Sequence, residues 1–217
     1  MRKVYPIGLL VEGRRCVVVG GGAVAERKVA SLLEAGGLVR VVSPDATPEL
    51  ARLAAEGRIE WRRAEAIEAD VAGAFLSIVA TDDATLNARL AAAANASGHL
   101  VNAVDQPDDC NFFVPASVQR GPILLTVSTG GGSPALAKRL RRELEARFGP
   151  EYGELAGILA CLRAEVMESF ATQAARAAAW ERVLDSAALE LLEQGRRDEA
   201  AAEARRAAGL PGADDGR

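Results

Sequence analysis

Residues 20–25, Gly-Gly-Gly-Ala-Val-Ala, constrain the fold of this chain more than any other segment. They fit the pattern G-x-G-x-x-(G/A) and stand between an apolar run, residues 16–19, and a helical pattern. In such a loop, Gly20 permits a tight turn and Gly22 lets a pyrophosphate approach backbone N–H groups at the positive end of the helix. Ala25 is small enough for the helix to pack closely on the strand. The loop predicts dinucleotide binding, with a plain strand–turn–helix as the alternative.

The segments around this loop alternate between short apolar strands and helical patterns. Strands are expected at residues 16–19, 38–42, 59–61, 74–80 and 100–104, and helices at 23–35, 47–56 and 83–97. Such alternation implies right-handed crossovers and a parallel sheet. Because the first and fourth strands are almost continuously apolar, both faces of the sheet are expected to be covered. The predicted fold class is α/β, with a Rossmann-type parallel sheet.

The pattern changes after residue 105. Strands are expected at residues 112–115 and 123–128, separated by a turn at Gly121-Pro122. Ser133 and Pro134 are typical of the N-cap and the first position of a helix, and residues 134–208 read as helical throughout. The sequence therefore predicts a small strand-containing region followed by a helical C-terminal domain.

Composition excludes some classes of function. The formal net charge is −4, which argues against nucleic acid as a partner. No apolar stretch is long enough to span a membrane, so we expect no membrane partner. Cys16, Cys110 and Cys161 are too scattered for a disulfide framework or a zinc site, which favours a reducing compartment and predicts no metal. We expect a cytoplasmic protein.

The end of the second strand bears on cofactor choice. It reads Val-Ser-Pro44-Asp45 and lacks an acid at the usual position for the ribose 2′-hydroxyl, although Asp45 or backbone groups could substitute. Arg52 is the first arginine after this strand, so a 2′-phosphate has no obvious partner. We therefore expect NAD rather than NADP.

Four motifs in series resemble those of one family. They are residues 20–28 (GGGAVAERK), 80–83 (ATDD), 101–105 (VNAVD) and 126–137 (TVSTGGGSPALA). In this order and at these separations they resemble precorrin-2 dehydrogenase, the dehydrogenase module of siroheme synthase. The resemblance implies a homodimer that oxidises precorrin-2, a tetrapyrrole, to sirohydrochlorin with NAD. Some members of the family also insert iron.

The resemblance completes the expected organisation of the chain. The apolar segments at residues 112–115 and 123–127 are too hydrophobic to remain open edges on a monomer, which predicts dimerisation through them. The predicted domains are an NAD-binding Rossmann domain (1–111), a dimerisation region (112–148), a helical C-terminal domain (149–208) and a disordered tail (209–217). Because the chain ends at residue 217, we expect a stand-alone module rather than a longer fused synthase.

Asp105 is the candidate catalytic residue. It follows the fifth strand at a carboxyl end of the sheet, where ligands bind in such folds. Oxidation of the macrocycle removes a hydride and a proton, so a carboxylate there has a role as general base. The family's catalytic aspartate falls on this position by resemblance; the alternative is a strand-end residue that caps the next turn. The candidate cofactor-binding residues are Gly20, Gly22, Ala23, Val24, Pro44, Asp45, Thr81 and Asp82.

Thr81 and Asp82 have an alternative role as part of the N-terminal cap of the following helix. By resemblance, the candidate substrate-binding residues are Ser128, Thr129, Gly130 and Lys138. The alternatives are a flexible strand–helix connection for the loop and a solvated helix face for the lysine. The loop lacks the Gly-Lys-Ser/Thr ending of a phosphate-binding P-loop.

Other functions stay open at this point. The nearest is a bifunctional dehydrogenase and sirohydrochlorin ferrochelatase. A non-enzymatic alternative is a regulatory module that senses NAD, which predicts cofactor binding without turnover and a dispensable Asp105. A methyltransferase is disfavoured by the extended dinucleotide motif.

Overall fold

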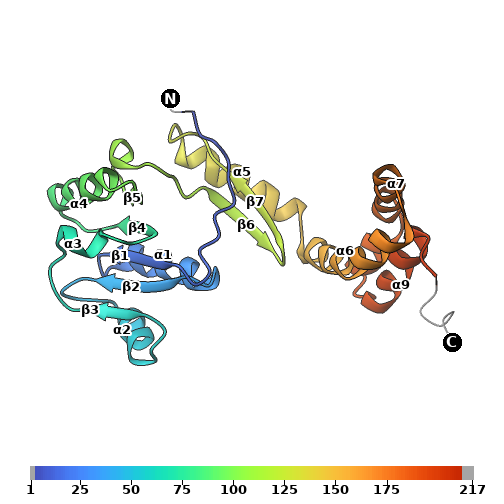
Figure 1. The fold of residues 1–217 in the computed structure, drawn as a ribbon, viewed down its shortest axis with the longest axis horizontal. Helices are drawn as coiled ribbons and strands as arrows, with labels where there is room; N and C mark the ends of the chain where they lie inside the picture. The colour runs from blue at the N-terminus through green and yellow to red at the C-terminus, as the bar shows by residue number, and fades with distance from the viewer. Residues whose placement is uncertain (1–2, 212–217) are drawn as a thin grey trace. The chain divides into compact units, whose positions relative to one another are not determined.

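The computed structural model describes residues 3–211, which divide into two compact units (Figure 1). The N-terminal unit ends at Val114, and the C-terminal unit begins at Pro115. The finer boundaries expected at residues 111/112 and 148/149 stay predictions. Residues 212–217 of the predicted disordered tail lie outside the described residues.

The N-terminal unit is built on a parallel sheet. Its elements are β1 (Arg15–Val19), α1 (Ala23–Glu34), β2 (Leu38–Val42), α2 (Pro48–Ala55), β3 (Glu60–Arg62), α3 (Glu68–Val71), β4 (Leu76–Val79), α4 (Ala84–Ala96), β5 (Leu100–Ala103) and the 3₁₀ turn η1 (Pro107–Asp109). The strand order is β3-β2-β1-β4-β5, and each neighbouring pair is parallel. The predicted α/β, Rossmann-type sheet is confirmed. The sequence analysis missed the short α3, which lies in the crossover from β3 to β4.

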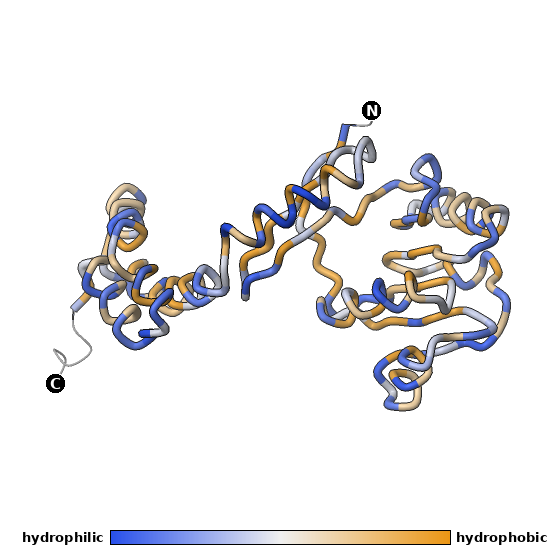
Figure 2. The backbone as a smooth tube through the Cα atoms, turned by 180° about the vertical axis from the view of Figure 1, so that it is seen from behind, coloured by the Kyte–Doolittle hydropathy of each residue, from blue (hydrophilic) through white to orange (hydrophobic). Residues whose placement is uncertain are grey.

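Two hydrophobic cores cover the two faces of this sheet. Cys16 and Val18 of β1 belong to the core that includes residues of α1 and α2, whereas Val17 and Val19 belong to the core that includes residues of α3 and α4. The central strand β1 is accordingly apolar from Cys16 to Val19, and Figure 2 shows hydrophobic colouring along much of the sheet. The strand order reverses between β1 and β4, and ligands of doubly wound folds bind outside the carboxyl ends of the strands at this point.

The C-terminal unit starts with a hairpin and continues as helices. Its elements are β6 (Ala116–Arg120), β7 (Ile123–Val127), α5 (Pro134–Arg147), α6 (Pro150–Ser169), α7 (Gln173–Leu184), α8 (Ala188–Glu193) and α9 (Arg197–Ala208). β6 and β7 are antiparallel, and helices α6–α9 enclose a core of their own that is rich in alanine. The predicted small strand region and helical C-terminal domain are confirmed as a fold class.

One expectation in this part of the chain was wrong. The strand expected at residues 112–115 is not formed, and β6 begins at Ala116 instead. The reason is that this stretch serves the N-terminal unit: Asn102 Nδ2 donates to the carbonyl of Phe112 at 3.1 Å, and Phe112 packs on the sheet core. The stretch expected to be helical, residues 134–208, is formed by five helices, which are separated in part by Gly149 and by Gly195, whose φ is 73°.

None of the helices between residues 3 and 211 combines the length and the hydropathy that a bilayer crossing requires. Within the same described range, α5 is unusual because none of its residues is buried. Leu136 and Leu140 of this helix are exposed, and Figure 2 shows the helix as largely hydrophilic.

Candidate active site

The loop between β1 and α1 has the geometry that its glycines predict. Gly20 has a φ of 114°, and a Cβ atom there would lie 2.3 Å from the carbonyl oxygen of Ala80. Gly22 is the N-cap of α1, and a Cβ atom on it would meet nothing within 4 Å. Ala25 is fully buried, as close packing of the helix on the strand requires. The loop therefore combines a fixed turn with open space at the helix N-terminus, where a phosphate group is favoured.

Gly21 is a residue whose role the sequence analysis missed. A Cβ atom on it would lie 1.9 Å from the carbonyl oxygen of Asp45, and its own carbonyl accepts a hydrogen bond from Thr47 N at 2.9 Å. The glycine loop and the loop after β2, which holds Pro44 and Asp45, are therefore in direct contact. The only available signal was the middle glycine of the run, at a position that the fingerprint leaves unspecified.

Ser43, at the end of β2, places a buried hydroxyl between these two loops. Its side chain is 4% exposed, and Oγ has no hydrogen-bond partner among the described residues. Oγ also lies 2.8 Å from the position of a Cβ on Gly21. Buried hydroxyls are normally satisfied, so an orphaned one beside a phosphate-type loop fits a ligand that supplies the partner. The chain thus fits a dinucleotide here although no acid ends β2.

In the turn after β4, the residue that caps the helix and the candidate cofactor-binding residue are different side chains. Asp83 Oδ1 accepts hydrogen bonds from Thr85 N and Leu86 N at 2.9 and 3.0 Å, so it caps α4. Thr81 instead hydrogen-bonds through Oγ1 to Asn87 Oδ1 at 2.6 Å, and Asn87 Nδ2 donates to the Thr81 carbonyl at 2.8 Å. Asp83 is thus structural, whereas Thr81 is held by a buried asparagine that the sequence analysis also missed.

Asp105 opens the segment after β5 and has an unusual backbone. Its φ is 60°, and among residues 3–211 it is the only non-glycine residue with a positive φ. Aspartate tolerates this region better than most residues, yet such conformations persist where the surroundings enforce them and are common at active sites. The carboxylate is exposed. The positive φ of Asp105 is a structural feature that no sequence pattern predicts.

A cleft of about 430 Å³ brings several of the candidate residues together. It is lined by residues from the first turns of α1 and α4 and from the segments after β4 and β5, namely Val24, Asn87, Thr81, Asp82 and Asp105. A carboxylate therefore faces the same space as the glycine-loop helix. Gly20, Gly22, Pro44 and Asp45 lie in the loops after β1 and β2, and Ala23 begins α1, along the same carboxyl edge of the sheet.

The four candidate substrate residues belong to the C-terminal unit. Thr129 Oγ1 accepts a hydrogen bond from Ser133 N at 3.1 Å, and Ser128 Oγ accepts one from Gly130 N at 3.3 Å, which orders the loop before α5. Lys138 is exposed on α5. The loop is therefore a defined turn within its own unit, and its contact with substrate stays a prediction.

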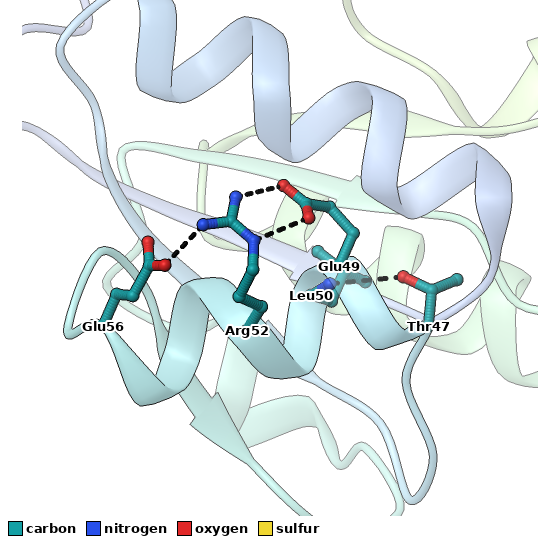
Figure 3. Close-up of polar contacts among 5 residues, drawn as sticks. All are labelled: Thr47, Glu49, Leu50, Arg52 and Glu56. Atoms are coloured by element: carbon teal, nitrogen blue, oxygen red, sulfur yellow. Dashed lines mark hydrogen bonds and ion pairs between the residues drawn. The ribbon is translucent and has the colours of Figure 1, made fainter.

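Arginines near the end of β2 bear on the choice of cofactor. Arg52 donates through Nη2 and Nε to the Glu49 carboxylate, at 2.6 and 2.9 Å, and through Nη1 to Glu56 (Figure 3). These hydrogen bonds raise the pKa of Arg52 and lower that of Glu49. Arg63, after β3, stacks 4.0 Å above the ring of Trp61, whose indole donates to the Ser43 carbonyl at 3.1 Å.

Three family models match the chain in succession. One described as NAD(P)-binding matches residues 7–116, one described as the central part of a sirohaem biosynthesis protein matches 120–147, and one described as the sirohaem synthase dimerisation region matches 151–207. The chain belongs to the NAD(P)-binding family of sirohaem biosynthesis. The resemblance drawn from the four motifs is thereby confirmed. The description places dimerisation in α6–α9, whereas the sequence analysis placed it at residues 112–148, which stays a prediction.

Individual proteins agree with this assignment. Siroheme synthases of Nitrosococcus oceani and Methylococcus capsulatus are 40% and 43% identical over 195 residues, which is 90% of this chain and 42% and 41% of those proteins. The chain thus spans about two fifths of the length of these curated relatives. The solved structure of SirC, a precorrin-2 dehydrogenase, is 26% identical and matches with a TM-score of 0.77 over 94% of this chain and 100% of that chain.

Proposed function

We propose that the chain is a precorrin-2 dehydrogenase that oxidises precorrin-2 to sirohydrochlorin with NAD. The observation that carries the proposal is the position of Asp105: a carboxylate on an enforced backbone turn, in the cleft that the glycine-loop helix also lines. The similarity to SirC over its whole length supports the same reaction, because it extends beyond the cofactor domain.

The chemistry needs two acceptors. NAD supplies the hydride acceptor when it is bound. The proton that also leaves the macrocycle needs a base, and the Asp105 carboxylate is available for it because it is exposed to the cleft and not committed to capping a helix. Gly20, Gly22, Ala23 and Val24 would hold the pyrophosphate end by backbone N–H groups, with Thr81 and Asp82 across the switch point.

For the cofactor we propose NAD over NADP. Arg52 follows β2 in sequence, and its guanidinium already hydrogen-bonds the carboxylates of Glu49 and Glu56. This supports the proposal that Arg52 does not bind a 2′-phosphate. We expect NAD to bind at least tenfold more tightly than NADP in a calorimetric titration. Equal affinities would contradict this, and Arg63→Glu would then test whether the arginine stacked on Trp61 holds the 2′-phosphate.

We propose a homodimer and a substrate site that involves Ser128, Thr129, Gly130 and Lys138. Precorrin-2 carries eight carboxylates, so a cation such as exposed Lys138 is suited to orient it. The unburied face of α5, with Leu136 and Leu140, supports dimerisation through the predicted region, and a second copy of the chain is the partner that the family description favours.

For the location we propose the cytoplasm. Cys16 is buried and Cys161 exposed, and neither is in a disulfide, which suits a reducing compartment. Cell fractionation with a tagged chain tests this.

The decisive experiment for the activity is a spectroscopic assay with enzymatically made precorrin-2 and NAD. The sirohydrochlorin spectrum should appear together with one equivalent of NADH. The NAD-sensing alternative predicts tight NAD binding with no spectral change, and that outcome would remove the enzymatic proposal. The bifunctional alternative is tested by the rate of iron insertion when the protein is mixed with sirohydrochlorin and Fe²⁺, compared with a protein-free control.

A further inference from the structure

The segment after β5 folds back on the strand that precedes it. β5 is an outer strand of the sheet, and Asn111 N donates to the Val101 carbonyl at 3.1 Å while Asn111 Oδ1 accepts from Val101 N at 2.9 Å. The 3₁₀ turn η1 lies between, so residues 104–110 form a closed loop with Asp105 near its start. The conformation of Asp105 is thus decided by how this loop is closed.

One sulfur atom bridges backbone groups on both sides of Asp105. Cys110 Sγ accepts a hydrogen bond from Ala103 N at 3.2 Å and lies 3.2 Å from the Ala103 carbonyl and 3.3 Å from the Gln106 carbonyl. A thiol has one hydrogen to donate, so it serves either of these two carbonyls. Ala103 and Gln106 stand on either side of Val104 and Asp105. The thiol therefore links the two ends of the four-residue stretch that contains the positive φ.

The surroundings of the sulfur indicate that these contacts are built in. Cys110 is 7% exposed, and Asn102 Nδ2, itself buried, lies 3.5 Å from Sγ while it also holds the Phe112 carbonyl. A small apolar side chain would fill the same volume but could not hydrogen-bond the backbone of Ala103 and Gln106. Packing alone thus does not account for the polar contacts of this side chain.

We propose that Cys110 is a positioning residue for Asp105: its thiol holds the turn in the conformation that presents the carboxylate to the cleft. This rests on the proposed role of Asp105 as the base. Because the carboxylate is held before substrate arrives, the proton-transfer step avoids the reorganisation of a mobile loop. Loss of the link would lower kcat and leave the cofactor loops untouched.

The test compares Cys110→Ala, which removes the hydrogen bonds, with Cys110→Ser, which keeps a donor and an acceptor. Cys161→Ala on α6 is the matched control. We expect Cys110→Ala to reduce kcat roughly ten- to hundredfold with an unchanged KM for NAD, and Cys110→Ser to stay within about threefold of the native rate. Hydrogen exchange should accelerate at residues 103–110 in Cys110→Ala and not in Cys110→Ser.

A double variant separates positioning from general stability. In the Asp105→Ala background, Cys110→Ala should cause no further loss of rate, because the two changes act on one element. Additive losses, or equal losses in the alanine and serine variants, would overturn the proposal. Normal turnover by Asp105→Ala would instead remove the proposed base. If hydrogen exchange at residues 103–110 is unchanged in Cys110→Ala while Asp105→Ala is inactive, Asp105 keeps its role as the base and the proposed role of Cys110 is wrong.

Discussion

The two units of this chain bury their hydrophobic residues in different ways. In the N-terminal unit, residues 16–19 of β1 are at most 1% exposed, and helices cover both faces of the sheet. In the C-terminal unit, α6–α9 enclose a core, whereas the hairpin and α5 leave large apolar side chains in solvent, with Leu124 54% and Leu136 48% exposed. A two-stranded hairpin and a helix without a buried face are not expected to be stable by themselves. The N-terminal unit thus buries its apolar strands by itself, whereas the exposed apolar side chains of the hairpin and α5 support the proposed dimer.

The largest effect is expected when the candidate base is removed from the N-terminal unit. Asp105→Ala should lower the rate of precorrin-2 oxidation about 10²–10⁴-fold, because proton loss then relies on water. The affinity for NAD and the dimer should stay unchanged, since the side chain is exposed and is not a cap. Stopped-flow absorbance measures the rate and calorimetry the affinity. Normal NADH production would contradict the assignment.

A pair of glycine variants tests how tightly the cofactor loop is built. Gly22→Asp should abolish NAD binding without unfolding the chain, because its side chain enters open space and its charge repels the pyrophosphate. Gly21→Ala should destabilise the fold instead, since its Cβ would lie 1.9 Å from the Asp45 carbonyl oxygen. Calorimetric titration and thermal unfolding followed by circular dichroism distinguish the two. A folded Gly22→Asp with native NAD affinity would remove the cofactor from this loop.

The proposed dimer contact of the C-terminal unit can be tested on the exposed side chains of α5. Leu136→Glu combined with Leu140→Glu should weaken the dimer roughly a hundredfold or more, because each copy loses two apolar contacts. NAD binding should persist. Arg139→Glu, a change at a side chain that is 79% exposed on the same helix, serves as control. Sedimentation equilibrium measures the association. A native dimer in the double variant would place dimerisation outside α5, in keeping with the family description of residues 151–207.

The smallest effect is expected at a partly exposed ion pair between α6 and α9, Glu165 with Arg205. The hydrogen bonds from Arg205 lower the pKa of Glu165, so this pair stabilises the fold above the unfolded carboxyl pKa of about 4.3 and ceases to do so as pH falls through the folded pKa. Glu165→Gln should therefore lower the Tm by no more than a few degrees at pH 7. The difference from the native chain should shrink as pH falls from about 4.3 and disappear only below the lowered folded pKa of Glu165. Thermal unfolding at a series of pH values measures it, with Glu168→Gln on the same helix as control.

Part of the site was predictable because its signals are local. The glycine run, the strand before it and the cap after β4 each lie within a few residues, so spacing alone indicates Gly20, Gly22 and the Asp83 cap region. The contact of Gly21 with Asp45 and the support of Thr81 by Asn87 are not local patterns. They exist only once the strands have been ordered, so sequence reasoning passed over Gly21 and Asn87.

Periodicity and turn chemistry act over a few residues, so the α/β class, the succession of strands and helices along the N-terminal unit and the position of the glycine loop follow from the amino-acid sequence. In contrast, the return of residues 110–112 along β5 in place of a new strand, and the positive φ of Asp105, depend on contacts between segments. An outer strand leaves backbone groups open on one side. Which segment meets them depends on long-range packing, which no local pattern records.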